Sequence, residues 1–120
     1  MSKSKVYFTK TISPEKMIDM VKILNSELPG KVAIKLHSGE VGNQNFLRPE
    51  FMKPVIDYVD GTVVECNTAY EGMRNTTEKH WETMKKHHWT DYFKVDIMDV
   101  DDEIEIPVKG GAVIQKNYVG

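Results

Sequence analysis

One short polar segment holds three side chains that could act together in chemistry. Lys35 and His37 are two residues apart, and Glu40 follows them closely. Because side chains two apart on a strand point to the same face, a cation and an imidazole would lie side by side, with a carboxylate just beyond. Such a group could bind an anion or transfer a proton. A lysine at a sheet edge and a histidine in a structural hydrogen bond would fit the same spacing.

A second polar segment carries an amide, a phenol and a guanidinium group on Asn67, Tyr70 and Arg74. Arginine is suited to grip a carboxylate or phosphate through two parallel hydrogen bonds. Loops rich in Asn and Gly are also ordinary turns, so a plain surface role stays open. The candidate ligand-binding residues are Lys35, His37, Glu40, Asn43, Asn45, Asn67, Tyr70 and Arg74.

The histidines offer only a weak metal site. Three of the four lie in one helix-like segment, where His80 is seven and eight residues from His87 and His88. A helical metal pair needs a spacing of three or four, so a zinc site on this helix alone is not expected. His80 could still reach a site built by the loops, which makes His37 and His80 the metal candidates; packing is the alternative for His80. No nucleophile with an adjacent base can be named, so whether the chain is an enzyme stays open.

The front of the chain fits a strand–helix–strand unit. Residues 6–8 and 31–37 are strand-like. Between them, Ser13-Pro14 is suited to begin a helix, and its apolar positions continue to about residue 28. This unit predicts a parallel sheet. The polar loop after residue 37 would then leave the carboxyl end of a strand, where open α/β sheets commonly bind ligands.

The rest of the chain continues the alternation and then becomes antiparallel. Further helices are expected from near Pro49 and from an N-cap at Asn75 to about His88, and strands over residues 62–66, 94–98, 103–109 and 112–118. Pro54 would kink the first of these helices or delay its start. Gly110-Gly111 permits a tight hairpin between the last two strands. The predicted fold class is α/β, with βαβ units, a mostly parallel sheet flanked by helices and a C-terminal β-hairpin, in a single domain over residues 1–120 because no linker or repeat divides the chain.

Composition limits the partners. The 120 residues carry 16 Lys and Arg against 18 Asp and Glu, so no broad positive field attracts nucleic acid. No apolar run approaches the roughly 20 residues that cross a bilayer, and the N-terminus lacks the apolar core of a signal peptide. The only cysteine, Cys66, cannot form an internal disulfide. These features predict a cytoplasmic protein that contacts neither nucleic acid nor membrane.

Four stretches of the sequence resemble one protein family. They are Lys31-Val32-Ala33-Ile34-Lys35-Leu36-His37-Ser38-Gly39-Glu40, Asn45-Phe46-Leu47-Arg48-Pro49, Glu65-Cys66-Asn67-Thr68-Ala69-Tyr70 and Arg74-Asn75-Thr76-Thr77. Together they are similar to the family called domain of unknown function 362, over almost all of the chain. The residues that match its motif positions are Lys35, His37, Glu40, Asn45, Asn67, Tyr70, Arg74 and His80.

The resemblance implies a longer protein. Members of that family look like chains with a later segment rich in His and Gly and often with cysteine motifs that hold iron-sulfur clusters. This chain would be the N-terminal portion, with no cofactor of its own, because Cys66 alone cannot supply four thiolates; any iron-sulfur cluster would lie in the missing C-terminal part.

Two functions are therefore expected as alternatives, since the family supplies no settled reaction. The first is a small-ligand or metal-binding half-site, which the remainder of the full-length protein would complete and couple to redox chemistry. The second is a non-catalytic scaffold or docking module, including a homo-oligomer formed through an unpaired sheet edge.

Overall fold

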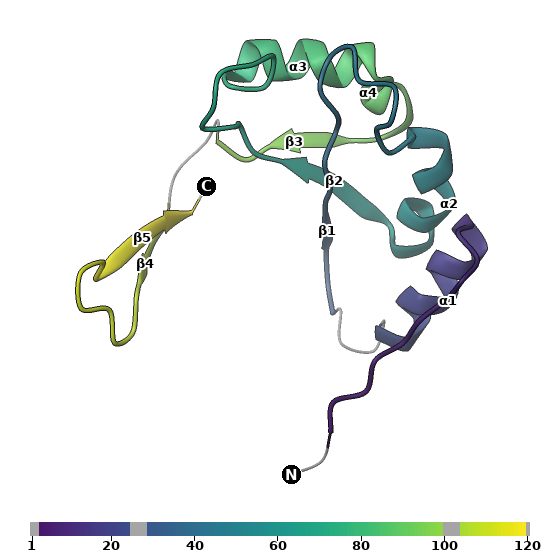
Figure 1. Cartoon of the computed structure of the whole chain (residues 1–120), viewed down its shortest axis with the longest axis horizontal. Coiled ribbons are helices and arrows are strands. Elements are labelled where there is room, and N and C mark those ends of the chain that lie inside the picture. Colours follow the sequence, from purple (N-terminus) through teal and green to yellow (C-terminus); the bar gives the residue numbers. More distant parts are fainter. Residues whose placement is uncertain (1–2, 25–28, 100–103, 120) are drawn as a thin grey trace.

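The chain builds a small parallel sheet, seen in a computed structural model that describes residues 3–24, 29–99 and 104–119 (Figure 1). The strands β1 (Val32–Lys35), β2 (Gly61–Glu65) and β3 (Val95–Ile97) are parallel and lie in the order β1-β2-β3. The register pairs Lys35 with Val64 and Glu65 with Ile97. The carboxyl ends of all three strands therefore meet at one edge of the sheet.

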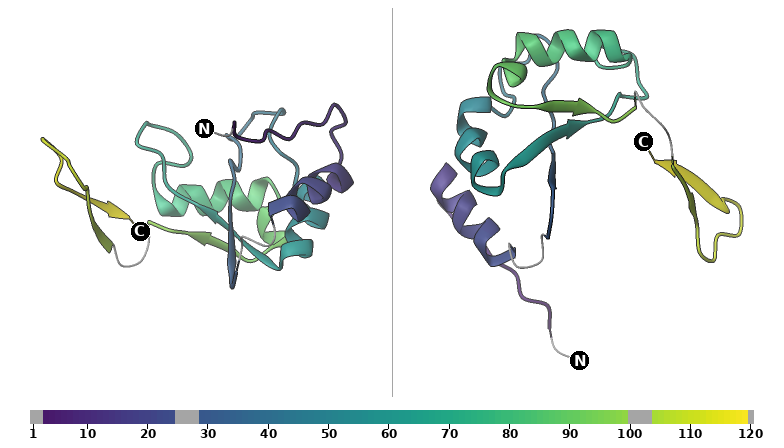
Figure 2. Two further views of the ribbon diagram at one scale, coloured as in Figure 1. Left: turned by 90° about the horizontal axis from the view of Figure 1, so that it is seen from below. Right: turned by 180° about the vertical axis from the view of Figure 1, so that it is seen from behind.

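In the part of the chain that the structure describes, four helices pack against this sheet: α1 (Pro14–Leu24), α2 (Pro49–Val59), α3 (Thr77–Lys86) and α4 (Trp89–Tyr92). Figures 1 and 2 show them in an arc along one side of the strands. The core joins Met52 and Val55 of α2, Met84 of α3 and Trp89 of α4 to Val63 of β2. The predicted α/β fold with a parallel sheet flanked by helices is confirmed.

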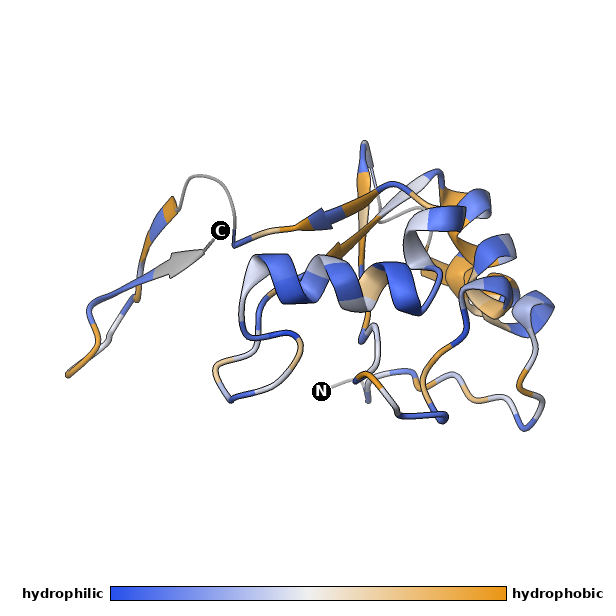
Figure 3. Cartoon of the chain, turned by 90° about the horizontal axis from the view of Figure 1, so that it is seen from above, coloured by the Kyte–Doolittle hydropathy of each residue, from blue (hydrophilic) through white to orange (hydrophobic). Residues whose placement is uncertain are grey.

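The opposite face of the sheet has a different character. Ala33, Lys35 and Asp96 alternate along β1 and β3 with the core-facing residues, and all three are exposed. In Figure 3 the hydrophobic residues gather where α1 and α2 meet the strands, while the outer side of α3 is hydrophilic. The apolar packing thus lies between the helices and one face of the sheet.

The first predicted strand is wrong. Residues 6–8 form no strand, and Val6 and Phe8 are 88% and 81% exposed. Strand propensity expresses itself only where a neighbouring strand offers pairing and packing, and this segment has neither. The βαβ units are instead β1-α2-β2 and β2-α3-β3.

The helix boundaries follow local chemistry. The start of α1 is as predicted, and Ser13 Oγ accepts a hydrogen bond from the Lys16 backbone N–H at 3.3 Å. The predicted extension from residue 25 to 28 lies outside the described residues. In α2, Pro49 is at the helix start, and the helix continues unbroken through the exposed Pro54. The expected start near Pro49 is confirmed, and of the two effects expected of Pro54, a kink or a delayed start, the delayed start is wrong. Pro54 removes only one hydrogen bond near the helix beginning.

The third helix begins and ends differently from the prediction. Its N-cap is Thr76, whose side chain accepts from the Lys79 backbone N–H, whereas Asn75 accepts from the Lys79 ammonium group at 3.1 Å. The helix ends at Lys86, because His88 adopts the left-handed region with φ of 63°. The short helix α4 follows this break, and no periodic pattern in four residues could have predicted it.

The C-terminal hairpin is confirmed, but its turn is wider than predicted. The strands β4 (Ile104–Pro107) and β5 (Lys116–Val119) are antiparallel, with Pro107 opposite Lys116. Residues 108–115 connect them, with Gly110 at φ of 79°, so Gly110-Gly111 is one part of a longer loop. All four residues of β4 are exposed, and Figure 1 shows the hairpin apart from the helices.

Candidate functional site

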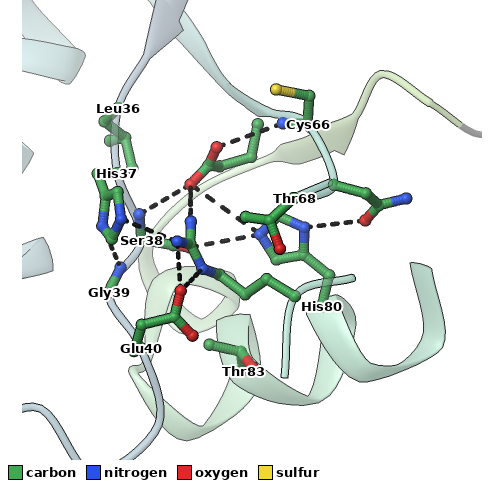
Figure 4. Close-up of polar contacts among 12 residues, drawn as sticks. Leu36, His37, Ser38, Gly39, Glu40, Cys66, Thr68, His80 and Thr83 are labelled. Carbon is green, nitrogen blue, oxygen red and sulfur yellow. Dashed lines mark hydrogen bonds and ion pairs between the residues drawn. The ribbon is translucent and has the colours of Figure 1, made fainter. Parts of the chain in front are cut away.

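The candidate side chains meet at the carboxyl edge of the parallel sheet. Residues 36–40 leave β1, residues 66–76 connect β2 to α3, and the two loops lie against the start of that helix (Figure 4). The loop after β3 joins them through Asp99, whose carboxylate accepts a hydrogen bond from the Asn67 backbone N–H. The parallel register explains this convergence, because it aligns the strand ends.

Glu65, the last residue of β2, is the centre of the site. It is 2% exposed, and its Oε2 accepts a hydrogen bond from Lys35 Nζ at 2.7 Å. Its Oε1 accepts from the Ser38 backbone N–H at 2.9 Å and from Arg74 Nη1 at 3.2 Å. Burial by itself would raise the pKa of Glu65, but the hydrogen bonds from Lys35 and Ser38 outweigh it and hold the pKa below the ordinary value. Glu65 is therefore a buried carboxylate anion at neutral pH.

Arg74, in the loop after β2, binds the carboxylates of Glu40 in the loop after β1 and of Glu65 at the end of β2. Its side chain is 2% exposed, and Nε and Nη2 donate to Glu40 Oε1 at 2.9 and 2.5 Å, while Nη1 donates to Glu65. Burial opposes its charge, but Glu40 and Glu65 raise the pKa of Arg74 above its ordinary value. The hydrogen bond from Arg74 in turn lowers the pKa of Glu40. Arg74 thus fixes the distance between the loops.

Three polar side chains cover this buried pair on the solvent side. The Lys35 side chain is 50% exposed, His37 is exposed, and Tyr70 is 59% exposed. His37 Nε2 lies 2.8 Å from Arg74 Nη2, and the Tyr70 hydroxyl lies 3.1 Å from the same nitrogen. A ligand that arrives from solvent meets these groups first.

Ser38 is a residue that the sequence reasoning missed, although it follows His37 directly. Its side chain is fully buried, and Oγ lies 3.1 Å from Glu65 Oε1 and 3.4 Å from His80 Nε2. Its carbonyl oxygen accepts hydrogen bonds from His87 Nδ1 at 2.9 Å and Trp89 Nε1 at 3.1 Å. Because these partners lie 27 to 51 residues away, local spacing gives no signal for them. Ser38 anchors the first loop to α3 and α4.

His80 and Asn67 extend this anchor. His80 Nδ1 lies 3.1 Å from Asn67 Oδ1, and burial is the main cause that lowers the pKa of His80. The order Ser38, neutral His80, Asn67 is that of a nucleophile, a base and an orienting amide, although no such pair was identified in the sequence. Ser38 Oγ has no exposed surface, however, so a substrate cannot reach it in this arrangement. The three residues act as a structural hydrogen-bond chain.

The remaining candidates are Asn43 and Asn45, together with the two histidines expected as metal ligands. Asn43 Oδ1 accepts from the Asn45 backbone N–H at 2.8 Å, so these two exposed residues form a local turn. The two metal candidates lie on different sides of Arg74, with His37 at its guanidinium and His80 facing Glu65 at 4.0 Å. Over residues 3–24, 29–99 and 104–119, no three His, Cys, Asp or Glu side chains gather in a way that would hold a metal ion.

Fold and site together define an α/β protein with a buried ion-paired cluster at the carboxyl edge of a parallel sheet. Residues 32–120 match the model of the family described as Domain of unknown function (DUF362), and the chain belongs to that family. The matched region begins at the first residue of β1 and contains the whole site, while α1 precedes it. No curated protein and no solved structure matches the chain. Within the described parts of the chain, none of the helices has the length and apolar character needed to cross a membrane.

Proposed function

We propose that this chain supplies a small-ligand-binding half-site, at the carboxyl edge of its parallel sheet, to a larger redox protein. The observation that carries the proposal is the Arg74–Glu65 ion pair, both members 2% exposed, beneath the exposed Lys35, His37 and Tyr70. Burying such a pair adds little stability, since desolvation offsets the attraction between the charges. Its benefit lies in holding the exposed donors in fixed positions, as a binding site requires.

The remainder of the full-length protein would complete the site and supply the redox chemistry. Cys66 is a single, partly buried thiol, whereas an iron-sulfur cluster is held by several protein ligands. Any iron-sulfur cluster would therefore be held by another part of the protein, and the residues of this chain would bind and orient the ligand. A free thiol without a disulfide partner suits a reducing, cytoplasmic compartment.

Removal of the Lys35 ammonium group tests the half-site. The probes are inorganic phosphate, citrate and Zn²⁺, each titrated into the chain while its backbone amides are followed by NMR. Lys35→Ala should weaken binding of at least one probe by about fivefold or more, which corresponds to the loss of one charge-assisted contact. Lys53→Ala is the matched control, because Lys53 is 45% exposed and pairs along α2 with Asp57 at 2.8 Å. Equal effects of the two variants, or no probe that shifts residues 35–40 and 67–74, would contradict the proposal.

A docking module is the second candidate, and the exposed apolar residues of the hairpin favour it. Ile104, Val113 and Ile114 are 68%, 93% and 63% exposed, and an isolated two-stranded hairpin is only marginally stable in water. Sedimentation velocity over a range of protein concentrations tests the self-association form of this function. A sedimentation coefficient that rises with concentration supports it, and a constant monomer value contradicts it.

A further inference from the structure

We infer that the ligand of this site is a small oxyanion, one oxygen of which binds between His37 Nε2 and Arg74 Nη2. This inference rests on the proposed function and names the chemical class of the ligand. The two nitrogen atoms are 2.8 Å apart at the solvent side of the buried cluster. The hydrogen atoms that each nitrogen carries decide what can bind there.

His37 faces a hydrogen-bond donor at each ring nitrogen. The Gly39 N–H lies 3.1 Å from Nδ1, and Arg74 Nη2 lies 2.8 Å from Nε2. A neutral imidazole has one lone pair and an imidazolium has none, so no protonation state accepts from both donors. Because Gly39 is buried and its amide needs an acceptor, the lone pair belongs at Nδ1 and a hydrogen at Nε2. Two donors then face each other.

Arg74 Nη2 carries two hydrogen atoms but has three polar neighbours. Glu40 Oε1 lies at 2.5 Å and the Tyr70 hydroxyl at 3.1 Å, so these two contacts already use both hydrogens. The approach of His37 is therefore a contact without a hydrogen bond. Since His37 and Tyr70 are exposed while Arg74 is 2% exposed, the first two can move and the guanidinium stays fixed.

An acceptor oxygen from a ligand would satisfy the two donors that face each other. Placed between the two nitrogens after a small rotation of His37, it accepts from Nε2–H and from the Nη2 hydrogen that Tyr70 releases, while the Tyr70 hydroxyl keeps its own hydrogen bond to Glu40 Oε1 at 3.2 Å. The Lys35 ammonium, half exposed and bound to the same Glu65 as Arg74, is the second cation of the cluster, so Lys35 and Arg74 together balance the carboxylates of Glu40 and Glu65. Carboxylates and phosphates are the small ligands that offer such oxygen atoms.

The same contacts disfavour a metal ion at His37. A metal binds a ring nitrogen through its lone pair, and the free ring nitrogen of His37 carries a hydrogen. The guanidinium at 2.8 Å would also repel a cation. His37, proposed above as a metal candidate, is thereby assigned to anion binding.

Long-range ¹H–¹⁵N NMR of the histidine rings in the chain tests this inference, with inorganic phosphate, acetate and Zn²⁺ titrated separately. Phosphate or acetate should shift His37 Nε2 and Arg74 Nε to saturation and leave the Nδ1 lone pair in place. His37→Ala should weaken that binding by about tenfold, the loss of one charge-assisted hydrogen bond. His88→Ala is the control, because His88 is exposed and pairs with Asp91 at 2.8 Å.

Each result has a defined meaning. Binding of phosphate or acetate that His37→Ala weakens supports the inference. Whichever of the two probes binds more tightly then indicates whether the ligand carries a phosphate or a carboxylate group. Zn²⁺ binding at His37 Nε2 without either oxyanion overturns the inference and leaves the proposed ligand site intact. Oxyanion binding that His37→Ala does not weaken also overturns the inference alone, whereas no shift with any of the three probes overturns both.

Discussion

Replacement of Arg74 by methionine should destabilise the chain by leaving the buried Glu65 carboxylate without one of its two cationic partners. Methionine keeps much of the length of the side chain but carries no charge and donates no hydrogen bond. Glu65, 2% exposed, would retain its bonds from Lys35, from Ser38 and from the Cys66 backbone N–H at 3.3 Å. Breaking a buried pair from one side costs about 3 to 5 kcal/mol, and the retained bonds place Arg74→Met near the lower end, about 3 kcal/mol.

The loss is measurable by urea and thermal unfolding followed by circular dichroism. For a chain of this length, about 3 kcal/mol corresponds to a decrease of the unfolding temperature by roughly 10 °C. Arg48→Met is the matched control, because Arg48 donates to the Gln44 carbonyl oxygen and lies 4.0 Å from the Phe46 ring centre at the exposed surface. It should cost about 1 kcal/mol or less.

A double variant separates the unpaired charge from simple loss of packing. Glu65→Gln removes the charge that Arg74→Met leaves behind, so the pair of substitutions should be less destabilising than the sum of the two single ones. Strict additivity would refute the reasoning, and so would an unfolding temperature of Arg74→Met equal to that of Arg48→Met.

Two further predictions concern pH and backbone conformation. The folded pKa values of Glu65 and Glu40 lie below the ordinary 4.5. The stability that these two carboxylates contribute is therefore complete above pH 4.5 and is lost as the pH falls through the lowered pKa values. Urea unfolding from about pH 6 to about pH 3 should show this loss of stability, with a flatter decline for Glu65→Gln. Gly39→Ala should destabilise the chain by about 1 to 3 kcal/mol more than Gly42→Ala in the same assay, because both glycines have positive φ but only at Gly39 would the added Cβ lie 2.5 Å from Phe46 Cβ. Equal losses for the two glycine variants, or equal pH profiles for wild type and Glu65→Gln, would count against these predictions.

The sequence predicted which side chains would lie close together where strand order alone determines their position. Lys35 is the last residue of β1, and Arg74 lies in the loop that follows β2 at the same end of the sheet. Their convergence on Glu65 therefore follows from the βαβ pattern. Ser38 and Glu65 were not among the candidates, because each reads locally as part of a loop or a strand. Their importance comes from partners distant in sequence, such as Trp89 for Ser38.

The errors in the fold have the same origin. The apolar residues 6–8 have strand propensity, but propensity specifies a strand only if another strand lies alongside. The end of α3 depends on the backbone of His88 in the left-handed region, which the helical pattern of the preceding residues does not report. In both places the deciding interaction is absent from the local pattern.

The connections at Ser38 also bear on how the chain folds. The Glu65 contact to the Ser38 amide spans 27 residues, the Arg74 contacts to Glu40 span 34, and the Trp89 contact to the Ser38 carbonyl spans 51. Closing such long loops is slow unless the strands and helices that flank them are already in place. The polar cluster should therefore form late and in a single step, so a partly folded chain would not contain part of the cluster in its final arrangement. The Ser38 amide would then gain protection from hydrogen exchange together with the core around Val63, so exchange at this single position would report when the site is complete.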